Sequence, residues 1–241
     1  MQKSDLSKDV LISGKTSFKI EVPYKLIETG KKGNKKPLIL YLHGFGDNLK
    51  DFEKQMAPLL DVEAYHLFIQ GPYPLYEKRG GKTVSKWGRA WYLYDGKRKQ
   101  FIKSLEITSE FIQEIVDNLI KFINVSRICV IGYSMGGYVA GYFGLTRWKH
   151  VHEIVVIGAR IKTEVISEDG WKNLNHLNIL AIHGKNDDTV DHKNQEKEIQ
   201  NLKERGISAQ LLLLDEKHGM NDNYIKNTLN WLRNNNYKQD E

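Results

Sequence analysis

A buried strand that runs directly into a glycine-flanked turn is the feature that most constrains the fold of this chain. Residues 128–131 are apolar throughout, and the sequence then reads Gly-Tyr-Ser-Met-Gly-Gly over residues 132–137. Glycine permits backbone conformations and close contacts that a Cβ atom excludes. A helical pattern follows, so the chain must turn sharply from strand to helix with Ser134 at the bend.

Short apolar runs predict six strands, with helical patterns between them. Several runs are continuously apolar, which is typical of strands covered on both faces. The alternation of strands and helices predicts a mostly parallel central sheet with helices on both faces, in a single α/β domain over residues 1–241. Residues 1–36 are expected to add antiparallel strands at one edge. The six predicted strands cover residues 37–43, 65–70, 127–132, 153–158, 178–183 and 209–215.

Three helices can be recognised from their apolar spacing. A stripe at helical spacing runs from Phe111 to Ile123. Asp191 is expected to cap a helix that ends at Gly206. Apolar residues at 225, 229 and 232 mark a final helix near the end of the chain.

Composition describes an ordinary globular chain. The net charge of +6, from 36 basic against 30 acidic residues, is interpreted as a solubility charge in preference to a sign of an anionic partner. We expect no nucleic-acid partner, because no RNA-binding signature accompanies the basic residues. No segment is long and apolar enough for a transmembrane span, and the first residues do not resemble a signal peptide. The single cysteine, Cys129, cannot form an internal disulfide, which favours a cytoplasmic location.

In parallel α/β sheets, ligands bind beyond the carboxyl ends of the strands, so the residues that follow each strand are candidates. Ser134 lies in a G-x-S-x-G sequence between a strand and a helix. A nucleophilic serine needs such a strained turn to expose its hydroxyl, and the free N–H groups of the next helix favour negative charge. The alternative is a tight glycine turn in which Ser134 only caps the helix.

The glycine-rich loop after the first predicted strand supplies a second element. An oxyanion hole needs two backbone donors, and the N–H groups of Phe45 and Met135 are the candidates. His43, within the same loop, is expected to hold the loop by hydrogen bonding.

Two further strands end in loops that contain a carboxylate and a histidine. Asp187, Asp188 and Asp191 follow one strand, and His218 follows the next. Asp191 is better explained as a helix cap. The chain order of serine, aspartate and histidine matches the order in the α/β-hydrolase arrangement.

These motifs together resemble the α/β-hydrolase superfamily, and more narrowly its phospholipase/carboxylesterase group, which includes the acyl-protein thioesterases. The group's L-H-G-x-G-D segment matches residues 42–47, and its G-x-S-x-G-G matches residues 132–137. Its H-G-x-x-D-x-x-V matches residues 183–190, and its last histidine matches His218. The resemblance implies an α/β-hydrolase fold without a large lid domain. It also implies a triad of Ser134, Asp187 and His218, with Asp187 favoured over Asp188.

The chain departs from the group at two places. Met135 stands where the thioesterases usually have glutamine, which the chemistry tolerates because only the backbone N–H is required. Residues 71–103 form a variable loop rich in aromatic and basic residues, expected near the active site. Trp91 and Tyr92 are candidate substrate contacts from this loop, the alternative being that its aromatic residues merely pack onto the domain.

The predicted function is hydrolysis of a carboxylic ester or thioester through an acyl-enzyme, on a small-molecule substrate. No cofactor or metal is expected, because the histidines are scattered and one cysteine makes no zinc set. Two alternatives stay open, which are a peptidase or amidase on the same fold and a catalytically silent binding protein. The sequence leaves acyl chain length and oligomeric state undetermined.

Overall fold

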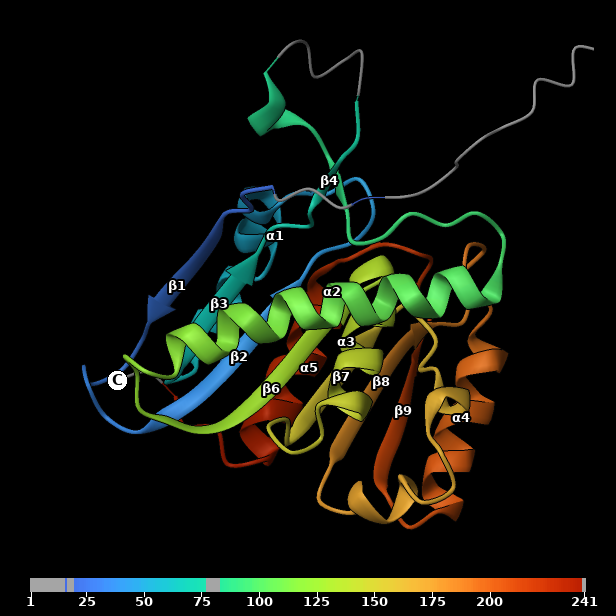
Figure 1. Cartoon of the computed structure of the whole chain (residues 1–241). Coiled ribbons are helices and arrows are strands. Elements are labelled where there is room, and N and C mark those ends of the chain that lie inside the picture. Colours follow the sequence, from blue (N-terminus) through green and yellow to red (C-terminus); the bar gives the residue numbers. More distant parts are fainter. Residues whose placement is uncertain (1–15, 17–19, 77–82, 240–241) are drawn as a thin grey trace, which may run out of the picture.

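The fold is built on one central sheet, seen in a computed structural model that describes residues 16, 20–76 and 83–239 (Figure 1). In the described part of the chain, the sheet has seven strands in the order β1-β3-β2-β6-β7-β8-β9. Their bounds are β1 (Tyr24–Glu28), β2 (Lys36–Leu42), β3 (Tyr65–Ile69), β6 (Val125–Tyr133), β7 (Glu153–Ile157), β8 (Asn178–Gly184) and β9 (Ser208–Leu214).

The sheet is parallel except at one edge. Strand β1 pairs antiparallel with β3, and every other neighbouring pair in the sheet is parallel. The six strands predicted from apolar runs are therefore confirmed, each within two residues at either end. Of the antiparallel strands expected near the N-terminus, β1 is the one within the described residues, and residues 1–15 and 17–19 lie outside them.

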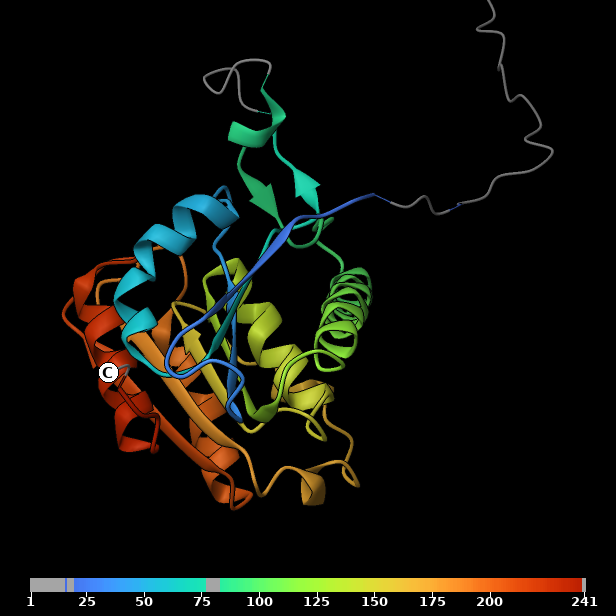
Figure 2. The same ribbon diagram turned by 90° about the vertical axis from the view of Figure 1, so that its left-hand side faces the viewer.

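Helices cover both faces of the sheet, as the sequence predicts. Helices α2, α3 and α4 contribute to one apolar cluster, and α1 and α5 contribute to the cluster on the opposite face. Figure 2 shows α1 and α5 to the left of the sheet and α2 and α3 to its right. The helices are α1 (Leu49–Gln55), α2 (Arg98–Leu119), α3 (Met135–Thr146), α4 (His192–Glu204) and α5 (Asp222–Asn234).

Successive residues of each inner strand point into opposite clusters. In β2, Leu40 belongs to the cluster beneath α3 whereas Ile39 belongs to the cluster beneath α5. The same alternation separates Val130 from Ile131 in β6. Because both faces are covered, both sets of positions are predominantly apolar, which explains the apolar runs in the sequence.

Side-chain caps fix where several helices begin. Asn48, Asp191 and Asn221 each accept a hydrogen bond from a backbone N–H in the first turn of α1, α4 and α5. The predicted cap at Asp191 is thus confirmed, with its carboxylate 3.0 Å from the Lys193 nitrogen. Such caps contribute about 1 kcal/mol each to helix stability.

The segment 71–103 is more ordered than the single loop that the sequence suggests. It contains a small hairpin of β4 (Tyr73–Pro74) and β5 (Arg89–Ala90), and its last residues already belong to α2, which begins at Arg98. Figures 1 and 2 show this hairpin projecting from the end of the sheet where the parallel strands finish. Residues 77–82 lie outside the described part. No separate lid domain occurs in the part of the chain that is described.

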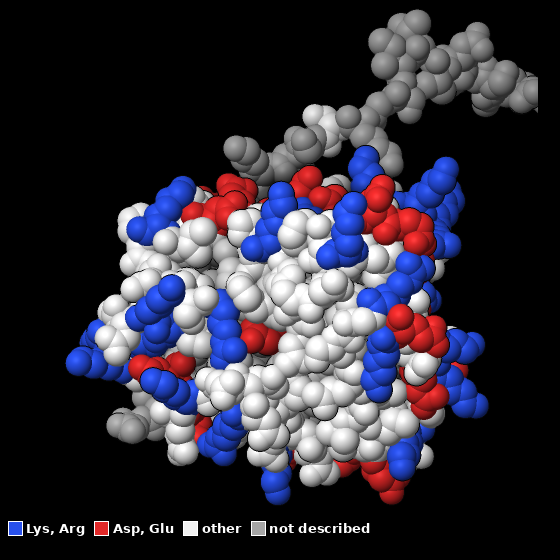
Figure 3. Space-filling model, turned by 90° about the horizontal axis from the view of Figure 1, so that it is seen from below, with Lys and Arg blue, Asp and Glu red and all other residues white. Residues whose placement is uncertain are grey.

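Charged residues of both signs are interspersed on the face opposite this hairpin, seen from below in Figure 3. This mixture agrees with the interpretation of the net charge as a solubility charge. Among the helices of the described residues, none has the length and apolar character needed to cross a membrane.

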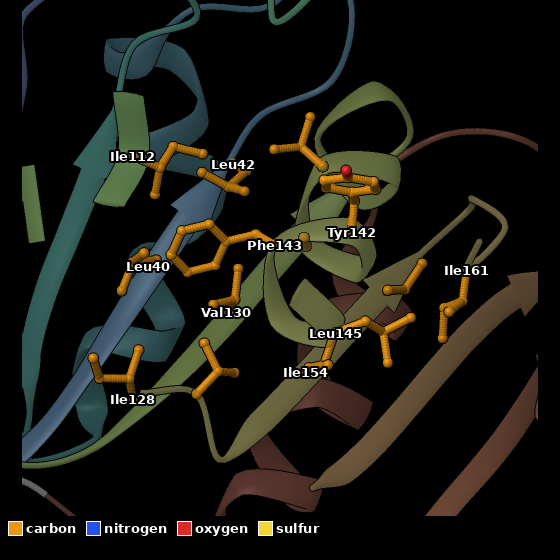
Figure 4. Packing of buried hydrophobic residues seen from close by; sticks show 14 of the residues in the cluster. Leu40, Leu42, Ile112, Ile128, Val130, Tyr142, Phe143, Leu145, Ile154 and Ile161 are labelled. Carbon is orange, nitrogen blue, oxygen red and sulfur yellow. The ribbon is translucent and has the colours of Figure 1, made fainter. Parts of the chain in front are cut away.

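Phe143 is a large buried side chain through which α3 packs on the sheet. Its ring points from α3 toward Leu40, Leu42 and Val130 of the sheet (Figure 4), and it is 1% exposed. Replacing it with alanine leaves a cavity, so we expect Phe143→Ala to lower the free energy of unfolding by about 3–5 kcal/mol in urea titrations. Phe122→Ala is the control, because that ring is 85% exposed. A loss below about 1 kcal/mol for Phe143→Ala would contradict this packing.

Candidate active site

Ser134 occupies the strained turn between β6 and α3 that its neighbours predict. Its backbone lies at φ 50° and ψ −116°, a region that residues other than glycine rarely adopt. The turn is held by hydrogen bonds from the Ser134 N–H to the Ile157 carbonyl (2.8 Å) and from the Gly137 N–H to the Ser134 carbonyl (2.9 Å). The surrounding sheet and helix therefore fix a conformation that the serine alone would avoid.

The two motif glycines are required by close contacts. A Cβ atom at Gly132 would lie 2.2 Å from the Gly136 carbonyl oxygen. A Cβ atom at Gly136 would lie 2.1 Å from the Leu42 carbonyl oxygen at the end of β2. Both distances are far below van der Waals contact, so α3 can start this close to the sheet only with glycine at these positions.

Ser134, His218 and Asp187 form a hydrogen-bonded row across three loops. His218 Nε2 lies 3.0 Å from Ser134 Oγ, and His218 Nδ1 lies 2.8 Å from Asp187 Oδ2. An ionised carboxylate can only accept, so Nδ1 carries the proton and Nε2 is free to accept the serine hydroxyl proton. This tautomer is the one that a general base requires.

The Asp187 carboxylate accepts hydrogen bonds from two backbone N–H groups in addition to His218. Its side chain is fully buried, and Oδ1 accepts hydrogen bonds from the backbone N–H groups of Thr189 (2.9 Å) and Val190 (2.8 Å). Burial pushes the pKa of Asp187 upward, but these N–H groups and His218 outweigh it, so that the pKa is lowered. Asp187 is therefore held as a carboxylate beside His218.

The other acidic candidates lie outside this row. Asp188, the next residue, is exposed and accepts a hydrogen bond from the Thr189 hydroxyl at 3.3 Å. Asp191 caps α4 as described above.

The Phe45 loop is attached to the β4–β5 hairpin by backbone hydrogen bonds. The Gly46 N–H donates to the Arg89 carbonyl (3.0 Å), and the Arg89 N–H donates to the Asp47 carbonyl (2.8 Å). Within the described residues, the N–H groups of Phe45 and Met135 make no hydrogen bond. Two unpaired donors thus flank Ser134, one from the loop after β2 and one from the first turn of α3.

His43 locks the base of this loop and takes no part in the row. Its Nε2 accepts from the Gly71 N–H (2.9 Å), so its Nδ1 carries the proton and donates to the Gly44 carbonyl (2.7 Å). Burial lowers the pKa of His43 to about 4, which keeps the ring neutral near pH 7. The prediction that His43 holds this loop by hydrogen bonding is therefore confirmed.

A cavity of about 360 Å³ lies beside the Ser134 turn. Tyr92 forms part of its wall, whereas Trp91 is fully buried and its indole N–H donates to the His43 carbonyl (2.8 Å). Of the two candidate contacts, Tyr92 therefore faces the cavity and Trp91 supports the loop. The lining residues are Tyr92, Tyr94, Phe101, Met135, Tyr138 and Lys162.

Metal ligation requires several His, Cys, Asp or Glu side chains to converge. Among the described residues, no group of three or more such side chains is placed to hold a metal ion.

Comparison with known proteins identifies the family. The model of the phospholipase/carboxylesterase family matches residues 23–235. The chain belongs to the phospholipase/carboxylesterase family. No relative among curated proteins matches the sequence.

Solved structures reproduce the fold of this family member at low sequence identity. Esterase PE8 has a TM-score of 0.69 at 20% identity, covering 89% of this chain and 99% of its own. Acyl-protein thioesterase 2 from Zea mays has a TM-score of 0.68 at 19% identity, with coverages of 88% and 98%. The Bacillus cereus carboxylesterase has a TM-score of 0.69 at 16% identity, with coverages of 88% and 94%.

Two neighbours of the row were not predicted as site residues. His183 is fully buried, with Nε2 3.2 Å from Asp187 Oδ2 and 2.8 Å from the Val190 carbonyl. Tyr133 stacks on the His218 ring with centroids 5.4 Å apart. His183 begins one motif of the phospholipase/carboxylesterase family and Tyr133 lies within another, so motif position is the available signal for both.

The neutral, buried His43 makes stability pH-dependent. Its ordinary pKa of 6.5 applies in the unfolded chain, whereas the folded value is about 4. The unfolded chain therefore takes up a proton first as pH falls. The contribution of His43 to the free energy of unfolding is fully present above pH 6.5. It is lost progressively as pH falls toward 4, by about 3 kcal/mol in all.

We therefore expect the difference in unfolding free energy between wild type and His43→Gln to shrink by about 2 kcal/mol from pH 7 to pH 4.5. Urea titrations at several pH values measure it. His150→Gln is the control, because His150 is exposed. A difference for His43→Gln that stays constant over this range would show that the buried ring is not held neutral.

Proposed function

We propose that this protein is a serine hydrolase that cleaves carboxylic esters or thioesters through a covalent acyl-enzyme. The observation that carries the proposal is the hydrogen-bonded row of Ser134, His218 and Asp187, with distances of 3.0 Å and 2.8 Å. The strained backbone of Ser134 at the start of α3 adds support, because that turn exposes the hydroxyl beside free helix N–H groups.

Acylation begins when Ser134 Oγ attacks the acyl carbon and His218 Nε2 takes the hydroxyl proton. The carbonyl oxygen becomes an oxyanion, which the Phe45 and Met135 N–H groups stabilise. The tetrahedral species then collapses, the bond to the leaving oxygen or sulfur breaks, and His218 returns the proton to that atom. Asp187 stabilises the imidazolium during both steps.

Deacylation reverses these roles with water. His218 removes a proton from water as the water oxygen attacks the acyl carbon. The bond from the acyl carbon to Ser134 Oγ breaks, and the proton returns to the serine. The free acid leaves, and the enzyme is restored.

The neighbours support the substrate class. Structures described as an esterase, a carboxylesterase and an acyl-protein thioesterase share this fold. The aromatic cavity beside Ser134, of about 360 Å³, is of a size to take one small acyl or alcohol group. We accordingly propose small-molecule esters or thioesters as substrates. A cytoplasmic location is part of the proposal, because Cys129 is free and buried.

The first test measures hydrolysis of 4-nitrophenyl esters with acyl chains from two to twelve carbons. Ser134→Ala should lower kcat/KM by about 10⁴-fold or more, because it removes the nucleophile. Ser126→Ala, an exposed serine on the same strand, should match wild type. A serine-reactive phosphonate should label wild type and not Ser134→Ala.

Each alternative gives a different outcome. Cleavage of aminoacyl amides without cleavage of esters would indicate a peptidase or amidase. A folded protein that hydrolyses neither and is not labelled by the phosphonate would indicate a silent binding protein.

The second test separates two adjacent aspartates. Asp187→Asn should lower kcat by roughly 10³- to 10⁴-fold, since an amide neither holds the required tautomer nor stabilises the imidazolium. Asp188→Asn, one residue along and exposed, should stay within about 2-fold of wild type. Equal effects of the two substitutions on ester hydrolysis would remove Asp187 from the proposed mechanism.

A further inference from the structure

Among the described residues, Lys162 is the one cationic side chain in the wall of the aromatic cavity next to the Ser134 turn. The loop that carries it starts at Gly158, where a Cβ atom would lie 3.5 Å from His218 Cε1. The Lys162 ammonium lies over the rings of Phe101 (5.3 Å to the centroid) and Tyr138 (5.7 Å). Met135 belongs both to this wall and to the turn that follows Ser134, so the ammonium shares a cavity with the nucleophile's immediate neighbour.

Within the described residues, this ammonium has one long ion pair and no direct hydrogen bond. The Lys162 side chain is 17% exposed, and its nearest carboxylate oxygen, on Glu164, is 3.7 Å away, beyond hydrogen-bond distance. Among the described residues, no oxygen accepts a hydrogen bond from Lys162. A partly buried ammonium whose donors are not taken by protein oxygens is available to a ligand that supplies acceptors.

The carboxylates near Lys162 are already engaged by arginines. Glu164 lies 2.6 Å from Arg160 and 4.0 Å from Arg98, in addition to its longer contact with Lys162. Glu198 is bound by Arg160 at 2.7 Å. Three cations thus face two carboxylates, which leaves a net positive charge around Lys162.

The pKa of Lys162 agrees with this arrangement. Burial lowers it first, and the Arg160 guanidinium lowers it further, against opposing effects of Glu164 and Glu198. An anion bound next to an ammonium with a lowered pKa stabilises the charged form and raises that pKa again.

We propose that this cavity selects esters or thioesters that carry a carboxylate, with the carboxylate bound by Lys162 and the apolar stem packed between the aromatic rings. The inference rests on the proposed hydrolase function and deepens it by naming the substrate class. The hydroxyls of Tyr92, Tyr94 and Tyr138 make no hydrogen bond with described residues and add donors that a carboxylate can use. A cationic substrate is disfavoured by the same ammonium.

The test compares pairs of esters that differ in one carboxylate. One pair is 4-nitrophenyl hexanoate and the 4-nitrophenyl monoester of adipic acid, which places the charge at the end of the acyl chain. The other pair is phenyl butyrate and 4-carboxyphenyl butyrate, which places it on the leaving group. We expect wild type to prefer the anionic member of at least one pair by roughly 10-fold or more in kcat/KM.

The variants ask whether Lys162 causes that preference. Lys162→Met keeps the length of the side chain without the charge, and should abolish the anionic preference. Lys162→Arg should retain most of it. Lys149→Met is the matched control, because Lys149 also lies over an aromatic ring, Trp148 at 5.5 Å, but outside this cavity. Wild-type hydrolysis of all four esters without preference, or a preference unchanged in Lys162→Met, overturns the inference while leaving the hydrolase function intact.

Binding gives a readout that does not depend on turnover. Ser134→Ala should bind the adipate monoester roughly 10-fold more tightly than the hexanoate ester in titration calorimetry, and adding Lys162→Met should remove that difference. Equal binding of the two esters overturns the inference whether or not the wild-type protein hydrolyses either one.

Discussion

The close approach of α3 to the end of β2 is the constraint on which the candidate site depends. With glycine at position 136, the first turn of the helix starts against the Leu42 carbonyl, and a Cβ there would lie only 2.1 Å from that oxygen. This contact holds the start of α3 against the end of β2, from which the Phe45 loop continues. It also fixes the serine at φ 50°, which a looser helix would allow to relax. The strain is offset by burial of α3 against the sheet.

The loops around Ser134 are joined to one another by hydrogen bonds of buried polar groups. His43 links the Gly44 carbonyl to the Gly71 N–H, and Arg89 links the Phe45 loop to the hairpin. The hairpin within residues 71–103 thus has a structural part in the site, through the backbone of Arg89. Donors that are already in position do not have to reorganise as negative charge develops on a substrate. In enzyme active sites, this preorganisation supplies much of the rate enhancement.

Much of the fold and the candidate site can be predicted from the sequence because each element leaves a local signal. Doubly covered strands leave continuous apolar runs, and Ser134, Asp187 and His218 each follow such a run. The start of α2 leaves no such signal, because its first residues are basic and exposed and Lys97 makes no capping hydrogen bond. Trp91 and Tyr92 are adjacent aromatic residues in the sequence, and only the three-dimensional packing separates the buried one from the one that lines the cavity.

Lys162 could not be assigned from the sequence for a related reason, because only the three-dimensional packing shows that its ammonium lies over Phe101 and Tyr138. On the face seen in Figure 3, acidic and basic residues are intermixed, and such solvated charges are screened by salt within about 10 Å. An ammonium that is 17% exposed over two aromatic rings is screened far less. A partly buried cation in the wall of the aromatic cavity is therefore the one proposed to act on a substrate, in preference to the solvated ones. The basic residue that lines the cavity comes from the loop after β7 and not from the 71–103 segment that supplies Tyr92.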